Sequence, residues 1–329
     1  MARMRAMVLQ APGQPLVPVE RALPDPGPGE VRVRVMACGV CRTDLHLVDG
    51  EVEGRLPVVP GHEVVGRIDA LGPGVTDLAP GQRVGIPWLG GTCGTCRFCR
   101  DGAENLCDAP AFTGCHRDGG YATHALADAR FVLPLDDDLD DIGTAPLLCA
   151  GLIGWRALKA AGDARVLGLY GFGAAAHLVA QVARAEGRTV LAFTRPGDVA
   201  AQRFARQLGC AFAAGADEAP PEPMDAAILF APAGELVPTA LAHVRKGGRV
   251  VCGGIHMSDI PGFPYRLLWG ERRVESVANL TRADGREFLA VAARLGLRAH
   301  AHARPLAEAN EALDDLRQGR VTGALVLVP

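Results

Sequence analysis

The chain has 329 residues, of which 49% are hydrophobic and 22% charged, and its formal net charge is −3. The length suggests about two domains, and the composition excludes a disordered chain. So small a net charge gives no electrostatic footprint for nucleic acid. The opening residues MARMRAMVLQ hold no apolar stretch fit for a signal peptide, so we expect a cytoplasmic protein whose cysteines stay reduced.

Residues 1 to about 145 have the pattern of a β-rich region. Short β-branched runs, such as residues 31–40 and 62–72, alternate with proline and glycine turns such as residues 24–30. We therefore predict several short strands before the first helical pattern.

Two short motifs within this region carry chemistry, CRTDLH at residues 41–46 and GHE at 61–63. A catalytic zinc takes three protein ligands and leaves one position open. Cys41 and His62 are candidates for two of these ligands. Cys149, in PLLCAGLIGW, is the best-placed third ligand, because it lies where the β-rich region ends. Taken singly, each of these residues is equally explained as a buried thiol or a core histidine.

Four cysteines lie close together in GTCGTCRFCRDGAENLC: Cys93, Cys96, Cys99 and Cys107. Thiolates at this spacing converge on one tetrahedral zinc and leave no open position, which predicts a closed structural site. An iron–sulfur cluster and a set of disulfides are the alternatives. Cys38, Cys115, Cys210 and Cys252 are expected to be buried structural thiols.

From about residue 150 the pattern changes to strand-like apolar runs that alternate with alanine-rich helical stretches, which predicts a parallel sheet covered by helices. The longest uncharged stretch, residues 166–183, is interrupted by glycines, so we read it as a strand, a turn and a helix rather than a membrane span. Beyond about residue 283, two helical stretches and a final strand are expected.

The first turn of this α/β region predicts a nucleotide site. Gly171, Phe172 and Gly173, followed by Ala174 and Ala176, give G-x-G-x-x-A between a strand and a helix. Glycines let the backbone approach a pyrophosphate at the helix N-terminus. An ordinary glycine turn is the alternative.

The end of the next strand bears on which dinucleotide is bound. Thr194 and Arg195 stand where an acidic residue would hold the ribose of NAD. A small hydroxyl residue followed by arginine favours the 2′-phosphate of NADP, so NADP is expected over NAD. A solvated surface arginine is the alternative reading of Arg195.

These motifs occur in the order typical of one family. C-x-T-D-L-H, G-H-E, the four cysteines, P-L-L-C-A-G and the later glycine fingerprint together resemble the zinc-dependent alcohol dehydrogenases of the medium-chain dehydrogenase/reductase superfamily. The stretches CGGIHMSDIP and LLWGERRVESVANLTRADGREFL resemble a bacterial subgroup. The resemblance implies a GroES-like catalytic domain (residues 1–150 and 283–329) with an inserted Rossmann domain (151–282), that is, an α/β plus β fold.

The resemblance also implies roles for single residues. Cys41, His62 and Cys149 match the ligands of the catalytic zinc, and Glu63 matches the acidic residue beside it. Asp44 matches the carboxylate that orients the ligand histidine. The remaining matches are Thr43 and His46 for the proton relay, Arg42, Gly254 and Ile255 for the cofactor, and Trp88 and Val52 for the substrate pocket.

The implied activity is hydride transfer between a primary alcohol or aldehyde and NAD(P), with two zinc ions in each chain of a homodimer or homotetramer. Zinc acts as a Lewis acid, and the proton of the alcohol passes from Thr43 through the cofactor ribose to His46. A secondary-alcohol, polyol or cinnamyl-type dehydrogenase is the alternative on the same scaffold. A cofactor-binding redox sensor is a third hypothesis, but a sensor does not need Thr43 and His46.

Overall fold

The computed structural model describes residues 2–329 and divides the chain into two compact units. The first unit contains the chain up to Cys149, together with Leu280–Ala293 and Arg298–Pro329. The second contains Ala150–Asn279 and Arg294–Leu297. The sequence-based boundaries were residues 150 and 283; in the structure the chain leaves the first unit after Cys149 and re-enters it at Leu280.

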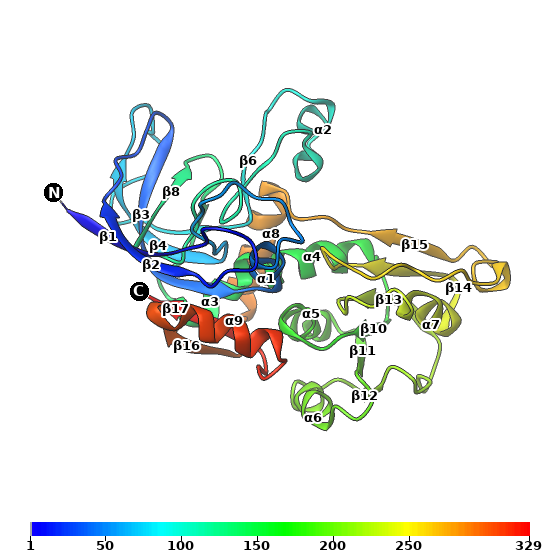
Figure 1. Cartoon of the computed structure of the whole chain (residues 1–329). Coiled ribbons are helices and arrows are strands. Elements are labelled where there is room, and N and C mark those ends of the chain that lie inside the picture. Colours follow the sequence, from blue (N-terminus) through cyan, green and yellow to red (C-terminus); the bar gives the residue numbers. More distant parts are fainter. Residues whose placement is uncertain (1) are drawn as a thin grey trace. The chain divides into compact units, whose positions relative to one another are not determined.

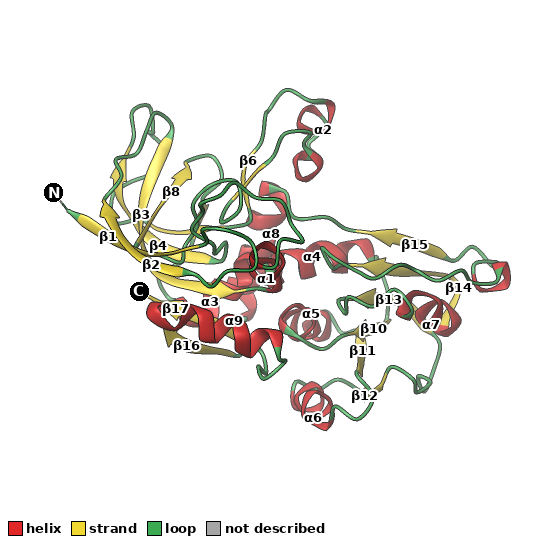
Figure 2. Cartoon of the chain, viewed as in Figure 1, coloured by secondary structure: helices red, strands yellow, loops and turns green. Residues whose placement is uncertain are grey.

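The first unit is built on a β-sheet whose strands come from both ends of the chain (Figures 1 and 2). Its order is β16 (Ala301–Pro305), β17 (Ala324–Val328), β3 (Glu30–Val40), β4 (Val64–Leu71), β5 (Arg83–Ile86) and β9 (Leu133–Pro134), and β8 (His124–Asp128) also pairs with β3. The central strand β3 alternates: Val31, Val33 and Val35 are buried, and the residues between them are more exposed. This period of two buries one face of the strand in the core.

Smaller elements of the first unit carry most of its chemistry. They are the hairpins β1 (Arg3–Val8)–β2 (Val17–Ala22) and β6 (Leu89–Gly91)–β7 (Ala111–Phe112), and the helices α1 (Arg42–Val48), α2 (Arg97–Arg100), α3 (Asp141–Thr144), α8 (Arg282–Leu295) and α9 (Ala309–Arg317). Two short 3₁₀ turns also matter below, Glu104–Leu106 and Ala145–Leu148.

The second unit is a six-stranded parallel sheet. Its order is β12 (Phe212–Gly215), β11 (Thr189–Thr194), β10 (Val166–Tyr170), β13 (Met224–Leu229), β14 (Val244–Cys252) and β15 (Arg273–Ser276). Counted from β10, this is the order 3-2-1-4-5-6 of dinucleotide-binding folds, as predicted.

Helices α4 (Ala150–Ala160), α5 (Ala174–Ala185), α6 (Val199–Gln207) and α7 (Leu236–His243) cover this parallel sheet. Stacked Tyr170 and Phe193 lie in its core, with Leu229 and Val250 among their neighbours. Among the described residues, every helix is too short or too polar to cross a bilayer.

Candidate active site and cysteine lobe

Four residues of the first unit converge on one point, which we call the buried cluster: Cys41, His62, Glu63 and Cys149. One ligand atom from each lies within 4.8 Å of the others, and the two thiols are 3.8 Å apart. Cys41 immediately precedes α1, His62 and Glu63 immediately precede β4, and Cys149 follows the 3₁₀ turn Ala145–Leu148. The structure thus brings together the three zinc ligands predicted from the sequence.

Asp44 links these elements. One of its carboxylate oxygens accepts the backbone N–H of Cys41 at 2.9 Å, and the other accepts the N–H of Gly61 at 3.2 Å. Nδ1 of His62 lies 3.2 Å from the second oxygen, although its N–H direction falls short of a hydrogen bond. The carboxylate therefore stands behind the imidazole, as expected for an outer partner of a metal-bound histidine.

His62 supplies the test of whether a metal fits. Its side chain is fully buried, and Nε2 has no hydrogen-bond partner among the described residues. An unpaired buried nitrogen is costly, whereas a nitrogen that coordinates an ion is satisfied. With two thiols within reach, the donor set is one that zinc prefers, so the buried cluster fits the predicted metal.

Protonation within the buried cluster is uneven. A hydrogen bond from Cys149 lowers the pKa of Cys41 well below its usual value, and His62 adds to this effect against the opposing effect of burial. The same hydrogen bond and burial raise the pKa of Cys149. Burial and the charge of Cys41 also raise the pKa of Glu63. For His62, burial acts to lower the pKa, but Asp44 and Cys41 outweigh it and raise it. A divalent cation would relieve this crowding by stabilising the thiolates.

The other predicted catalytic residues lie on α1. Oγ1 of Thr43 is buried 3.7 Å from the thiol of Cys41. Nδ1 of His46 lies 2.5 Å from a carboxylate oxygen of Glu51, a partner that the sequence analysis did not identify. Arg42 is exposed in the first turn of the helix.

Of the two predicted pocket residues, only Trp88 contacts the buried cluster. Its ring meets His62 edge-on with centroids 4.9 Å apart, and its other neighbour is the stacked ring of Phe112. Val52 is half-buried and donates its backbone N–H to the carbonyl of His46.

Tyr121 and Gly39 lie against residues of this site, and the sequence analysis singled out neither of them. The hydroxyl of Tyr121 donates to Asp44 at 3.0 Å. A Cβ on Gly39 would lie 1.7 Å from a carboxylate oxygen of Glu63, so only glycine leaves room for that acid. A signal was present for both, since each lies in a short glycine-containing motif, CGVC at 38–41 and GGYA at 119–122.

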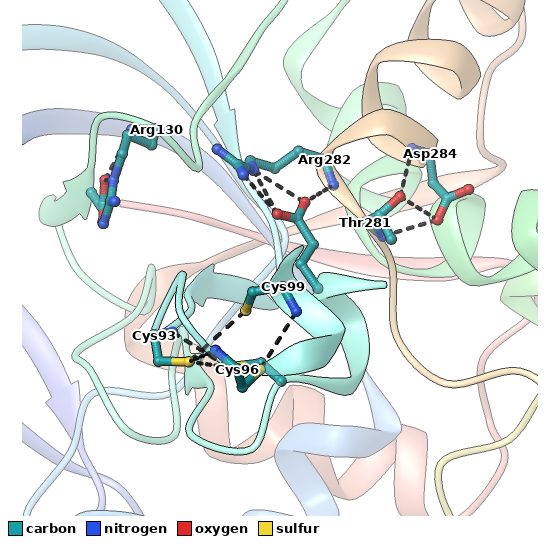
Figure 3. A network of polar contacts seen from close by, with 10 residues as sticks. Cys93, Cys96, Cys99, Arg130, Thr281, Arg282 and Asp284 are labelled. Carbon is teal, nitrogen blue, oxygen red and sulfur yellow. Dashed lines mark hydrogen bonds and ion pairs between the residues drawn. The ribbon is translucent and has the colours of Figure 1, made fainter. Parts of the chain in front are cut away.

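The second cluster is the cysteine lobe, formed by Cys93, Cys96, Cys99 and Cys107 (Figure 3). Its Sγ atoms also lie within 4.8 Å of one another. Backbone N–H groups point at the sulfurs, for example from Cys96 to Cys93 at 3.4 Å and from Cys99 to Cys96 at 3.5 Å. N–H groups of Thr95 and Cys96 lower the pKa of Cys93 to about 6. Because such bonds favour thiolates, the lobe is suited to a cation held by four sulfurs.

An ion pair ties the cysteine lobe to the C-terminal segment (Figure 3). Glu104, between the third and fourth cysteines, accepts the backbone N–H of Arg282 at 2.7 Å and two side-chain N–H groups at 2.7 and 3.0 Å. The guanidinium also lies 4.6 Å from the ring centroid of Phe131. Glu104 thus holds the first residue of α8, the helix with which the chain re-enters this unit.

The glycine turn predicted to bind a nucleotide lies between β10 and α5. Gly171 has φ +86°, and a Cβ there would lie 2.6 Å from the backbone N of Ala231. A Cβ on Gly173, the N-cap of α5, would meet nothing within 4 Å. The start of α5 at Ala174 therefore has open space beside amides that lack helical partners, which fits a pyrophosphate. Phe172 is buried between these glycines.

The remaining predicted cofactor residues lie at or just after the carboxyl ends of β11 and β14. These strand ends share one edge of the sheet with the glycine turn. Thr194 is buried, and its hydroxyl contacts the carbonyls of Arg195 and Ala214. Arg195 is exposed, and Gly254 and the exposed Ile255 lie beyond β14. Arg195, rather than Thr194, is therefore free to meet a ligand.

Of the four cysteines without a predicted role, Cys38, Cys115 and Cys210 are buried, as expected, and Cys252 is half-buried. Burial raises the pKa of Cys115 and of Cys210 to about 11, which keeps both protonated. These thiols fit the packing role predicted for them.

The fold and the two clusters define the class of metal-dependent dehydrogenases with a dinucleotide-binding unit. A family model of the alcohol dehydrogenase GroES-like domain matches residues 27–137. A probable alcohol dehydrogenase of Mycobacterium tuberculosis is 45% identical over 340 residues, covering 99% of this chain and 98% of the relative. The chain therefore belongs to the zinc-dependent alcohol dehydrogenases of the medium-chain dehydrogenase/reductase superfamily, oxidoreductases that act on alcohols.

Solved structures agree along the whole chain. A thermostable alcohol dehydrogenase from Pyrobaculum aerophilum has a TM-score of 0.90 and 27% identity, covering 100% of both chains. Acetophenone reductase from Geotrichum candidum, in complex with NAD, has a TM-score of 0.89 and 26% identity, covering 99% of this chain and 97% of that one. The predicted family and two-domain fold are confirmed.

Proposed function

We propose that this protein catalyses the reversible oxidation of primary alcohols to aldehydes with NADP, at a zinc ion held by Cys41, His62 and Cys149. The observation that carries this proposal is the buried imidazole of His62, whose Nε2 has no partner among the described residues and of which one ring nitrogen lies within 4.8 Å of two thiols. Three such ligands leave one position for the alcohol oxygen, and zinc bound there would supply the Lewis acidity that lowers the pKa of the alcohol.

The residues around the buried cluster take distinct roles. Asp44 fixes the imidazole of His62, and the hydroxyl of Thr43, beside Cys41, is placed to hold the proton of the substrate oxygen. His46 on α1, with its partner Glu51 just beyond that helix, is the group to which that proton is passed. Glu63, whose raised pKa reflects its burial, is the reserve acid beside the metal.

The cysteine lobe holds the second, structural zinc in this proposal. Its donor set is four thiols, and no water or substrate position remains when all four bind. With ten free cysteines to keep reduced, the protein is assigned to the cytoplasm.

Arg195 supports the choice of NADP, because it is exposed just past the strand end where a 2′-phosphate would lie. Replacing it with alanine is expected to raise the KM for NADP about tenfold and leave the KM for NAD unchanged, since one charged hydrogen bond is removed. Thr194 offers a poorer test, because an aspartate there would be buried against two carbonyl oxygens. Equal effects on both dinucleotides would remove Arg195 from the proposal.

We also expect a homodimer or homotetramer formed through the dinucleotide-binding unit. Strand β15 is an edge of the parallel sheet, and Tyr265 and Trp269, just before it in the chain, are 68% and 64% exposed. Apolar side chains beside an open strand edge are typical of a surface covered by a second copy. Sedimentation of the purified protein measures the assembly.

The decisive experiment is a panel of primary, secondary, polyol and cinnamyl-type alcohols, each tested with NAD and with NADP while the absorbance of the reduced nicotinamide is followed. The proposal predicts the highest kcat/KM for primary alcohols with NADP. A preference for secondary alcohols would instead support the alternative on the same scaffold. If no alcohol reduced either dinucleotide, the result would favour the cofactor-binding sensor.

A further inference from the structure

Tyr121 lies behind the metal site rather than in it. Its side chain is fully buried, and its hydroxyl donates to Oδ2 of Asp44 at 3.0 Å. Burial and the charge of Asp44 raise the pKa of Tyr121 well above its usual value. The phenol therefore stays protonated and remains a hydrogen-bond donor.

The two oxygens of Asp44 serve different partners. Oδ2 is held from two directions, by the backbone N–H of Cys41 at 2.9 Å and by the hydroxyl of Tyr121. Oδ1 faces the backbone N–H of Gly61 and Nδ1 of His62, each at 3.2 Å. Because Oδ2 is anchored on both sides, the carboxylate resists rotation, and Oδ1 stays beside the imidazole.

Tyr121 also acts on the backbone that leads to His62. Its N–H donates to the carbonyl of Pro60 at 3.0 Å, and the N–H of Gly120 donates to the carbonyl of Gly61 at 2.9 Å. A Cβ on Gly61 would lie 2.4 Å from the ring of Tyr121. The same side chain thus packs on the residue before His62 and holds the carboxylate behind it.

We propose that Tyr121 is a positioning residue for the metal, whose hydroxyl fixes Asp44 so that the imidazole of His62 presents Nε2 to the ion. This inference rests on the proposed function, because it requires that His62 bind a metal together with Cys41 and Cys149. Loss of an outer partner of a metal-bound histidine lowers metal affinity about 10- to 100-fold. We place Tyr121 at the lower end of that range because Cys41 still holds Oδ2.

The test compares Tyr121→Phe with the unaltered protein, both full-length and loaded with zinc. Zinc release into a colour-forming chelator is expected in two phases, one from each cluster. Cys41→Ser and Cys93→Ser assign the phases, since each should abolish one. We expect Tyr121→Phe to accelerate release from the buried cluster about tenfold and to leave release from the cysteine lobe unchanged.

Tyr170→Phe is the matched control. Tyr170 is also a fully buried tyrosine, but it lies in the parallel-sheet unit, where its hydroxyl is 3.5 Å from Nδ1 of His243. Its loss should leave both phases unchanged. A second readout separates positioning from general loosening: after Co²⁺ replaces zinc, the ligand-field absorption bands of fully loaded Tyr121→Phe should shift, and those of Tyr170→Phe should not.

Asp44→Asn provides a second test of the role of Tyr121, so that the conclusion does not depend on Tyr121→Phe alone. Because Tyr121 acts through Asp44, adding Tyr121→Phe to Asp44→Asn should accelerate zinc release far less than it does alone. Additive effects, acceleration of both phases, or an unchanged release rate with unchanged cobalt bands would each overturn the role of Tyr121. If the unaltered protein lacks a phase that Cys41→Ser removes, the metal site itself fails, and the proposed function fails with it.

Discussion

The buried cluster and the cysteine lobe hold their ligand atoms equally close, yet they are assembled in opposite ways. The lobe takes all four ligands from residues 93–107, and its first cysteine is exposed. The buried cluster takes Cys41, His62 and Cys149 from three separate segments, and its two cysteines are 108 residues apart. A local loop closes at little entropic cost, whereas the buried cluster depends on the folded sheet.

This difference underlies our proposal that one cluster holds a metal for structure and the other holds a metal for chemistry. The lobe offers four sulfurs that accept backbone N–H groups, and an ion bound there would stabilise the loop of residues 93–107. The buried cluster mixes sulfur, nitrogen and carboxylate, and hydrogen bonds, burial and neighbouring charges together shift the pKa of every member. The pKa of Cys93 in the lobe is lowered too, to about 6, so the mixed set of ligand atoms, and not perturbed pKa values alone, distinguishes the buried cluster as a candidate catalytic site. Substitution of a ligand in the buried cluster should therefore mainly reduce catalysis, whereas substitution of a ligand in the cysteine lobe should mainly reduce stability.

The largest effect on catalysis is expected from Cys41→Ser. Lewis-acid stabilisation is worth several kcal/mol, so kcat/KM should fall at least about 10³-fold. Metal analysis should show that one zinc per chain is lost and the other kept, with little change in the temperature of unfolding. Unchanged zinc content would remove Cys41 from the metal site, whatever happened to the activity.

Cys93→Ser should produce the reverse pattern. Losing a structural metal costs about 4 kcal/mol or more, so the thermal inactivation half-life should shorten sharply. At low temperature the molecules that remain folded should keep kcat near that of the unaltered protein, because the lobe contributes no ligand to the buried cluster. A selective loss of kcat with normal thermal stability would contradict the division between the two clusters.

The contrast also explains what the sequence could predict. Cysteines at spacings of two, two and seven residues predict the lobe directly, and Gly171 and Gly173 between a strand and a helix predict the dinucleotide turn. The alternation of strands and helices predicts a parallel sheet covered by helices, but it does not determine the order of the strands. In each case the information lies within a short stretch of chain.

Contacts between distant segments could not be predicted in this way. Cys149 was assigned with the help of family resemblance, and so was the return of the chain to the first unit. Tyr121 meets Asp44 across 77 residues, and Arg282 meets Glu104 across 178. A motif such as GGYA can draw attention to one residue, but it does not identify the partner, because each contact depends on where the fold places two separate segments.

The smallest of these effects is expected for Glu104→Gln, which weakens the link between the lobe and α8. Hydrogen bonds to charged groups contribute about 1.5–3 kcal/mol, and the 37% exposure of the Arg282 side chain reduces this. We expect a loss of about 1–2 kcal/mol in the free energy of unfolding. The effect stays limited because Thr281 and Asp284 still cap α8, with the Thr281 hydroxyl donating to Asp284 at 2.8 Å.

The matched control for this link is Asp128→Asn, which breaks a local pair with the exposed Arg130 near the same lobe. The Asp128 side chain is only 15% exposed, but that of Arg130 is 67% exposed, and this exposure weakens the pair, so its effect should be smaller than that of Glu104→Gln. If both variants lowered the free energy of unfolding equally, the contact between Glu104 and α8 would contribute no more than a local ion pair. The cysteine lobe would then not be coupled in stability to the C-terminal segment.

The dependence of the Glu104→Gln effect on pH has a defined sign. Burial acts to raise the pKa of Glu104, but hydrogen bonds from Arg282 outweigh it and lower the pKa below its usual value. The folded state therefore favours the ionised form, and the stability that this adds is complete above the pKa of an unfolded glutamate, about 4.3. The difference between the two proteins, compared at equal zinc content, should stay constant from neutral pH to about one unit above that value. It should shrink as the pH falls below that value and on through the lower folded-state pKa. A difference that grew on acidification would mean that Arg282 does not hold Glu104 in its ionised form.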